Sequence, residues 1–185
     1  WTGTDIRKES QGTTKEQDSI QYRVIEQLQK RDYTVIVDDD GSGEAADVVA
    51  IRETEQTVAV EFYHCKFSHE TTPGSRIDDL YTVCGQAQKS IRWMKDPSEL
   101  FVHLLRRESI RQSGELPTRL ERGTQDDLMR ICEKSRYRSI ELTVVIVQPG
   151  VSKARISDSQ LELLCVTENY LKETYQLPLS VIVSP

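Results

Sequence analysis

The chain has 185 residues, of which 37% are hydrophobic and 29% charged, and its formal net charge is −6 at pH 7. This length suits one domain with a proper core, and the composition argues against a disordered chain or a fibre. No apolar run approaches the ~20 residues of a membrane helix and no secretion signal opens the chain, so we expect a cytoplasmic protein with no membrane partner. The first residue is Trp1 and not methionine, from which we expect a piece of a longer polypeptide.

The first half of the chain predicts one helix followed by three strands. Residues 1–17 are polar and have no apolar period, which indicates an N-terminal arm or linker before a domain that spans 18–185. Apolar residues then recur every three or four positions, which predicts a helix over 18–30. Segments rich in β-branched residues, with polar or glycine-containing turns between them, predict strands at 33–38, 45–52 and 57–67.

The second half of the chain predicts mostly helices and two late strands. The apolar pattern predicts helices at 77–95, from Pro97 through Leu105, at 126–135 and at 157–175. The stretch between the second and third of these helices is expected to be irregular, and 96–137 is expected to form a helical insert. Strands are predicted at 140–147, where the sequence Gln-Pro-Gly is expected to end the strand, and at 179–183.

The order of the elements predicts an α/β fold with a central mixed sheet. Three consecutive strands suit an antiparallel meander. Two apolar strands separated by a helix suit parallel neighbours joined by a right-handed crossover. We therefore expect an αβββα core followed by βαβ, with helices flanking the sheet.

Charge is distributed unevenly along the chain. Residues 86–138 contain 12 basic and 8 acidic residues, whereas the rest of the chain contains 12 basic and 22 acidic residues. This local excess of +4 is compatible with solvated helical faces, or with a surface that contacts phosphates. For the second case the predicted DNA-binding residues are Lys89, Arg92, Arg106 and Arg107.

Two neighbouring predicted strands carry residues that suit phosphodiester chemistry. Asp47 is the lone acid of an apolar strand, where an unpaired carboxylate is costly to bury. Alternation along 57–67 places His64 and Lys66 on one face at the end of the strand. A carboxylate that holds a divalent cation, with a lysine that holds water or phosphate, is what metal-assisted phosphodiester hydrolysis requires.

These motifs, together with the order of the elements, resemble the PD-(D/E)XK nuclease superfamily. The matching segments are DDDGSGEAADVVAIR, VAVEFYHCK and GQAQKS, and the likeness is strongest to Mrr-like restriction endonuclease domains attached to DEAD-like helicases in bacterial antiviral defence. The resemblance implies a restriction-endonuclease-like fold, Mg²⁺ or Mn²⁺ as cofactor, and DNA as substrate, with RNA as a possibility. It also implies a covalently linked helicase and a possible homodimer. Asp47 takes the place of the family's metal ligand, Lys66 of its lysine, and Gln86 or Gln88 of a glutamine that orients phosphate or water.

The chain departs from the family pattern at two positions. The residue two before the lysine is His64 where the family has an acid, so either His64 completes the metal site or Glu61 does so after a bulge in the strand. Gln21 occupies the place of a glutamate on the first helix. Both departures also suit an inactive nuclease-like module that binds nucleic acid or a partner protein.

Two further alternatives start from the same segments. The sequence His-Cys-Lys at 64–66 also fits a metal-independent HxK phosphodiesterase with a histidine nucleophile, although Thr71 occupies the place of the aspartate expected there. The acidic loop residues Asp38, Asp39, Asp40 and Glu44 fit either a solvated turn or auxiliary cation binding.

Overall fold

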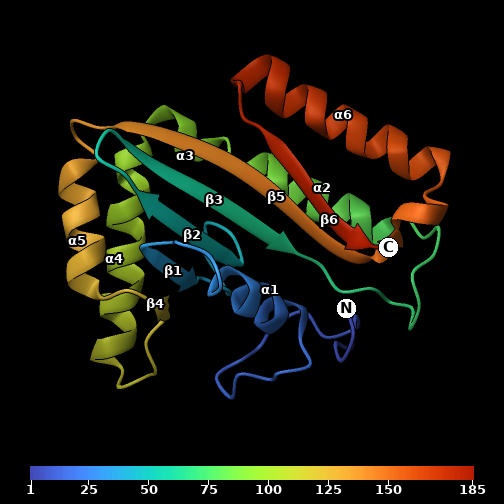
Figure 1. Cartoon of the computed structure of the whole chain (residues 1–185), viewed down its shortest axis with the longest axis horizontal. Helices are drawn as coiled ribbons and strands as arrows, with labels where there is room; N and C mark the ends of the chain where they lie inside the picture. The colour runs from blue at the N-terminus through green and yellow to red at the C-terminus, as the bar shows by residue number, and fades with distance from the viewer.

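The computed structural model describes residues 1–185 and contains six strands in one mixed sheet, with helices on both of its faces (Figure 1). The order across the sheet is β4-β1-β2-β3-β5-β6. The strands are β1 (Val35–Asp38), β2 (Val48–Glu53), β3 (Thr57–Cys65), β4 (Leu120–Arg122), β5 (Ser139–Ser152) and β6 (Leu179–Ser184). The predicted α/β fold with a central mixed sheet is confirmed.

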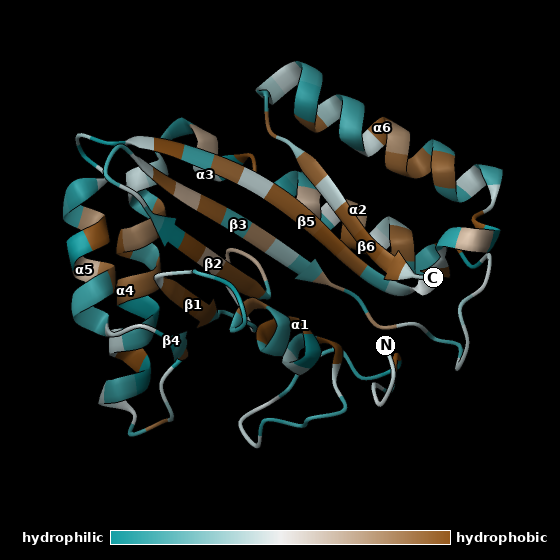
Figure 2. Ribbon diagram, viewed as in Figure 1, coloured by the Kyte–Doolittle hydropathy of each residue, from teal (hydrophilic) through white to brown (hydrophobic).

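Six α-helices accompany the sheet, and none is long and apolar enough to cross a membrane. They are α1 (Ile20–Leu28), α2 (Asp78–Lys89), α3 (Arg92–Lys95), α4 (Pro97–Ser113), α5 (Gln125–Lys134) and α6 (Asp158–Tyr175). Apolar side chains of α2 to α6 form one core with the first face of the sheet, whereas α1 packs on the second face. In Figure 2 the strands between these layers are mainly white and brown, and the helices carry most of the teal.

The sheet has the two parts that the sequence predicts. β1 pairs antiparallel with β2, and β2 with β3, which makes the expected meander. β5 is parallel to both β3 and β6, and α6 connects β5 to β6. Side chains of β3 alternate between the two cores, so Val60 and Phe62 pack on the α2 side while Tyr63 and Cys65 pack on the α1 side.

The first helix shows why the local sequence folds as predicted. The Ser19 hydroxyl accepts a hydrogen bond from the Tyr22 amide at 3.2 Å, which caps the otherwise unpaired N-terminus of α1. Ile20, Val24 and Leu28 lie on one stripe and are almost fully buried against the sheet. Helix formation therefore depends on burial of this stripe.

The strand predicted to stop at Val147 runs instead to Ser152, through Pro149 and Gly150. A register shift between β5 and β6 accommodates the proline, which has no amide hydrogen to donate. A Cβ atom on Gly150 would lie 2.8 Å from the Ser68 side chain, so this position requires glycine. The Gly74 amide donates to the Gly150 carbonyl at 2.9 Å, so the segment from Ser68 to Gly74 contacts β5 at this position.

Other boundaries also differ from the prediction: the strand expected over 45–52 begins at Val48, so Asp47 precedes it, and the strand expected over 57–67 ends at Cys65. The segment expected to be irregular contains β4, a three-residue strand at the sheet edge that pairs antiparallel with β1. The helix expected over 77–95 is divided into α2 and α3. At the division the Ser90 amide bonds the Ala87 carbonyl at 3.1 Å, three residues back, which tightens the last turn.

Residues 1–17 contain no helix or strand, yet they do not form a free arm. Ile6 and Gln11 are buried, and the Ile6 carbonyl accepts the Ser68 amide at 2.7 Å. The Gln11 side chain donates to Asp38 at 2.7 Å and to Glu121 at 2.9 Å. This N-terminal segment is therefore attached to β1, to β4 and to the chain that leaves β3.

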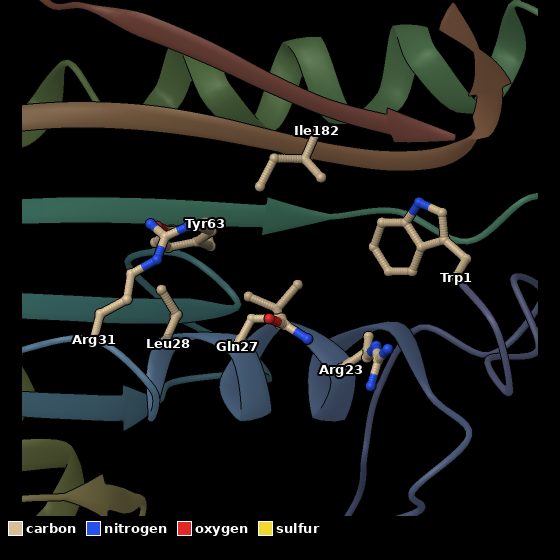
Figure 3. Close-up of a pocket in the computed structure, with 8 residues that line it drawn as sticks. Trp1, Arg23, Gln27, Leu28, Arg31, Tyr63 and Ile182 are labelled. Carbon is tan, nitrogen blue, oxygen red and sulfur yellow. The ribbon is translucent and has the colours of Figure 1, made fainter. Parts of the chain in front are cut away.

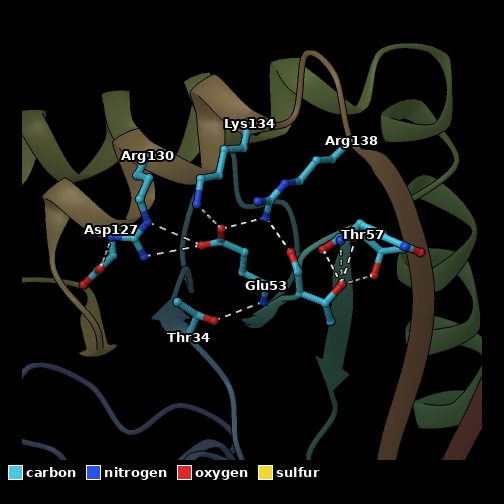
Figure 4. Close-up of polar contacts among 9 residues, drawn as sticks. Thr34, Glu53, Thr57, Asp127, Arg130, Lys134 and Arg138 are labelled. Atoms are coloured by element: carbon cyan, nitrogen blue, oxygen red, sulfur yellow. Dashed lines mark hydrogen bonds and ion pairs between the residues drawn. The ribbon is translucent and has the colours of Figure 1, made fainter.

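Residues 96–137 belong to the main core and to the sheet. Phe101 and Leu104 of α4 and Leu128 of α5 are buried against the first face. The carboxylate of Glu53, at the end of β2, accepts from Lys134 and from Arg138, the latter at 2.7 Å, and also contacts Arg130 (Figure 4). These ion pairs hold α5 and the residues just beyond it against the β2–β3 turn.

Candidate functional site

The candidate site lies where three strands meet at one end of the sheet. Asp38, the last residue of β1, is opposite Val48, the first residue of β2, and Val48 is opposite Tyr63 near the end of β3. The loop between β1 and β2 and the residues after β3 are therefore neighbours. Most of the acids predicted to do chemistry are on this loop.

Asp47 directly precedes β2 and is 2% exposed. One carboxylate oxygen accepts the Cys65 amide at 2.9 Å, and the other accepts the Gln21 side-chain amide at 3.3 Å. The chain supplies no ion pair to this carboxylate. Burial, together with the charges of Glu44, Glu9 and Asp40, raises the pKa of Asp47 to about 8, although the Cys65 hydrogen bond opposes this shift.

Asp47 lies with two other acids, which we call the carboxylate cluster: one oxygen from each of Asp40, Glu44 and Asp47 lies within 4.8 Å of the others. Asp40 accepts from the Ser10 hydroxyl at 2.5 Å, and Glu44 accepts from the Gly41 amide at 2.8 Å. Burial raises the pKa of Glu44, and the charges of Asp40 and Asp39 add to this effect. The three oxygens are close enough to hold a metal ion, and cation binding by Asp40 and Glu44 stays a prediction.

Lys66 is next to the Cys65 amide that binds Asp47. Its ammonium lies 2.8 Å from the Glu9 carboxylate, and 4.3 Å from the centre of the Phe67 ring. The same Glu9 carboxylate accepts the Phe67 amide at 2.9 Å. The charge of Glu9, the ion-pair partner of Lys66, is also one of those that raise the pKa of Asp47.

The expectation that His64 and Lys66 emerge on one face is wrong. His64 is 3% exposed, and its Nε2 lies 2.7 Å from the Ser90 hydroxyl at the end of α2. Lys66 instead contacts Glu9, in the N-terminal segment beside α1. The strand ends at Cys65, so alternation no longer fixes the direction of Lys66.

His64 is also outside the carboxylate cluster. Its Nδ1 is buried without a hydrogen-bond partner, and burial, with a smaller effect of the Lys89 charge, lowers the pKa of His64 to about 4. The imidazole is therefore neutral at physiological pH. Its bond to Ser90 connects β3 with the end of α2, and the metal-ligand role expected for His64 stays a prediction.

The alternative ligand, Glu61, does not reach the cluster. The pairing of β2 with β3 runs without a register shift from Val48 opposite Tyr63 to Glu53 opposite Val58, so the required bulge is absent. Glu61 lies opposite Ala50, in the middle of the strand, and accepts the Tyr63 hydroxyl at 2.6 Å.

Gln86 and Lys89 lie on α2 near the cluster. Together with His64 and Glu44 they line an open cavity of about 340 Å³ against the loop 41–45. The side-chain oxygen of Gln86 is buried and has no partner. Glu44 connects this cavity with the carboxylate cluster, so Gln86 lies on the α2 side of the site.

DNA binding by the four predicted cations stays a prediction. Arg107 is largely buried: it pairs with Asp39 at 2.5 Å and donates to the Ser42 carbonyl at 2.6 Å, so it holds the loop between β1 and β2 in place. Arg92 lies 4.2 Å from the centre of the Trp93 ring, and Arg106 is exposed on α4. Lys89 is the one that borders the site.

Sequence reasoning missed Glu9, and it did not anticipate how Asp39 is used. Asp39 is fully buried between Arg107 and the Ala45 amide, and it shapes the loop that carries Asp40 and Glu44. Glu9 is in a polar segment with no periodic pattern, and no local signal marks it. The run of acids at 38–40 was the available signal for the cluster.

A separate apolar groove of about 250 Å³ lies between α1 and β6 (Figure 3). Val24, Leu28, Tyr63 and Ile182 line it, with Trp1 at one side. No carboxylate lines this groove, so it does not offer the cation chemistry of the cluster.

A search of protein-family models, of curated proteins and of solved structures finds no match to this chain.

Proposed function

We propose that this chain is a divalent-metal-dependent phosphodiesterase domain that acts on nucleic acid, with a restriction-endonuclease-like core. The observation that carries the proposal is the carboxylate cluster of Asp40, Glu44 and Asp47 at the meeting point of three strands. Asp47, which is buried and has no cationic partner in the chain, supports it. A second support is the resemblance of the element order, helix, three strands and helix followed by βαβ, to the PD-(D/E)XK nucleases.

The residues of the cluster fit a hard divalent cation. Mg²⁺ and Mn²⁺ prefer oxygen ligands, and three carboxylate oxygens within 4.8 Å close on one ion with small side-chain shifts. Placing the buried Asp47 beside two half-buried acids raises the free energy of the folded state unless protons or a cation neutralise them. When bound, Mg²⁺ or Mn²⁺ polarises a phosphoryl oxygen and lowers the pKa of a coordinated water.

The residues around the cluster supply positioning and charge. The Cys65 amide and the Gln21 side chain hold the Asp47 carboxylate in one orientation. The Lys66 ammonium, kept in place by Glu9, donates to a phosphoryl oxygen and stabilises the negative charge that develops there during hydrolysis. Gln86 orients phosphate or water from the α2 side.

The contacts of His64 argue against a metal-independent HxK mechanism. A histidine nucleophile must reach phosphorus, yet His64 is almost fully buried and bonds Ser90. The lysine of the motif faces another layer.

An inactive nuclease-like module is the second candidate. It is favoured by two neutral side chains in places where the related family has acids: Gln21, which faces Asp47 as an amide, and His64, which Ser90 engages. Such a module would bind nucleic acid or a protein partner. A linked helicase and a homodimer are proposals that accompany either candidate.

Cleavage of radiolabelled DNA and RNA, in single and double strands, tests the proposal. We expect cleavage with Mg²⁺ or Mn²⁺, its loss in EDTA, and its loss in Asp47→Asn. The matched control is Asp32→Asn, whose carboxyl is 81% exposed and which lies outside the cluster. Binding of nucleic acid without cleavage in either metal supports the inactive module, and cleavage unaffected by EDTA contradicts the metal-dependent proposal.

A further inference from the structure

Another cavity, of about 160 Å³, lies next to the carboxylate cluster and shares Asp40 with it. The N-terminal segment, the end of β1 and the chain between α4 and β4 surround it, and no hydrophobic side chain lines it. The lining includes the guanidinium groups of Arg111 and Arg119, hydroxyls of Ser10, Thr13 and Thr118, and the carboxyls of Asp38 and Asp40. Asp40 belongs both to this cavity and to the carboxylate cluster.

Neither arginine of the cavity makes an ion pair, although two carboxylates line the same space. Arg119 donates to the carbonyls of Asp40 at 2.8 Å and Asp38 at 3.2 Å, and its Nε is buried without a partner. Arg111 donates through Nε to the Pro117 carbonyl at 2.9 Å. Backbone contacts thus fix both guanidinium groups, and no carboxylate makes a direct ion pair with either.

We infer that this cavity is a phosphate subsite, which binds one phosphate group of the nucleic-acid backbone beside the cation of the carboxylate cluster. Guanidinium groups and hydroxyls are the donors that recognise phosphate oxygens. The absence of an apolar wall argues against a nucleobase, which binds by stacking on aromatic or apolar side chains. The remaining polar space is large enough for a phosphate group and water.

The two acids of the cavity, Asp38 and Asp40, predict that a bound cation controls phosphate binding. In the absence of a cation, Asp40 and Asp38 repel an anion and offset the attraction of Arg111 and Arg119. A divalent cation at the carboxylate cluster neutralises most of the negative charge next to Asp40 and so weakens the repulsion of the phosphate. Cation and phosphate therefore stabilise each other's binding, and by linkage the effect is equal in both directions.

This subsite rests on the cation of the proposed function, and binding measurements test the two separately. Manganese binding is followed by electron paramagnetic resonance, and inorganic phosphate binding by calorimetry, each with and without the other ion. We expect Mn²⁺ to tighten phosphate binding on the order of tenfold, and phosphate to tighten Mn²⁺ binding by the same factor.

Arg111→Gln is the variant of choice, because Arg111 is partly exposed and Arg119 supports the backbone of the loop. We expect Arg111→Gln to bind Mn²⁺ alone as the wild type does and to lose most of the coupling with phosphate. The control is Arg136→Gln, at an exposed arginine with no ion pair and outside the cavity. It should keep the full coupling.

The outcomes distinguish a failure of the phosphate subsite from a failure of the proposed metal site. If Mn²⁺ binds at the cluster but phosphate affinity is the same with and without it, the subsite is wrong and the proposed metal site stands. Coupling that persists in Arg111→Gln also overturns the subsite, because ions pairing in free solution or elsewhere on the protein would explain it. If Mn²⁺ does not bind, both the subsite and the metal-dependent function are contradicted.

Discussion

The buried carboxylate of Asp47 accepts the backbone amide of Cys65 at 2.9 Å, and this contact joins the start of β2 to the end of β3. Cys65 lies between His64, which contacts the α2 layer, and Lys66, which contacts Glu9 on the α1 side. The two side chains of the His-Cys-Lys sequence therefore belong to different environments.

Asp47 should make the stability of the fold depend on pH. Its pKa is about 8 in the folded protein and 3.8 without the fold, so the folded state retains a proton that the unfolded state releases. Stability from this group is therefore lost as pH rises between these values, by up to about 1.4 kcal/mol per pH unit. We expect Asp47→Asn to flatten this part of the pH dependence and to unfold at a higher temperature than the wild type at pH 8.

Thermal unfolding followed by circular dichroism from pH 4 to pH 9 measures this effect. The Asp32→Asn variant, at an exposed position, should follow the wild-type profile. If Asp47→Asn and the wild type have parallel profiles, the carboxylate does not titrate as described.

Because Glu44 belongs to the carboxylate cluster and His64 does not, substitutions at these two residues should change Mn²⁺ affinity by different amounts. Glu44→Gln removes one charged oxygen of the cluster and should weaken Mn²⁺ binding on the order of tenfold, because affinity depends on the number of charged ligands. His64→Gln should leave Mn²⁺ affinity within about twofold, since His64 lies outside the cluster. Titration of Mn²⁺ by electron paramagnetic resonance compares the two, and the reverse ranking would restore His64 as the ligand.

Lys66 is expected to act in cleavage and not in cation binding. Lys66→Met should reduce the cleavage rate about 10²- to 10³-fold, the usual effect of removing one donor to a developing negative charge. Mn²⁺ affinity should stay the same or rise, because Glu9 is then free of its ammonium partner. Lys172→Met, at an exposed position on α6, is the control. A Lys66→Met enzyme that folds and cleaves at the wild-type rate would remove Lys66 from the site.

The Glu53 ion pairs should contribute to stability and not to activity. Glu53→Gln leaves Arg130, Lys134 and Arg138 without their shared carboxylate and should destabilise the fold by about 1–2 kcal/mol. The control is Glu55→Gln, an exposed residue of the same turn that makes no ion pair. Urea unfolding compares the two variants, and equal free energies of unfolding would show that the ion pairs have no net effect.

The sequence was sufficient to predict the elements whose formation depends on local periodicity. The stripe of Ile20, Val24 and Leu28 predicts α1, and the β-branched runs predict β1, β2 and β3. β4 escaped prediction because it has three residues and one apolar side chain, and exists only through its pairing with β1. The extension of β5 through Pro149 depends on a bulge and on the close approach of Ser68, neither of which is visible in a local pattern.

Local patterns made only part of the candidate site predictable. Asp47 stands out as an acid in an apolar run, and the acids of the preceding loop could be assigned to a solvated turn or to auxiliary cation binding. Glu9, Arg111 and Arg119 reach the site through the path of irregular segments, so their positions follow from tertiary packing. Strand alternation gave a wrong direction for Lys66 because β3 ends one residue before it.

The most direct test of the carboxylate cluster is a crystal of this chain soaked in Mn²⁺ and measured for anomalous scattering. The predicted result is one peak in contact with carboxylate oxygens of Asp40, Glu44 and Asp47, which disappears in Asp47→Asn. A peak bound by His64 and distant from these three acids, or no peak at this end of the sheet, would contradict the metal site.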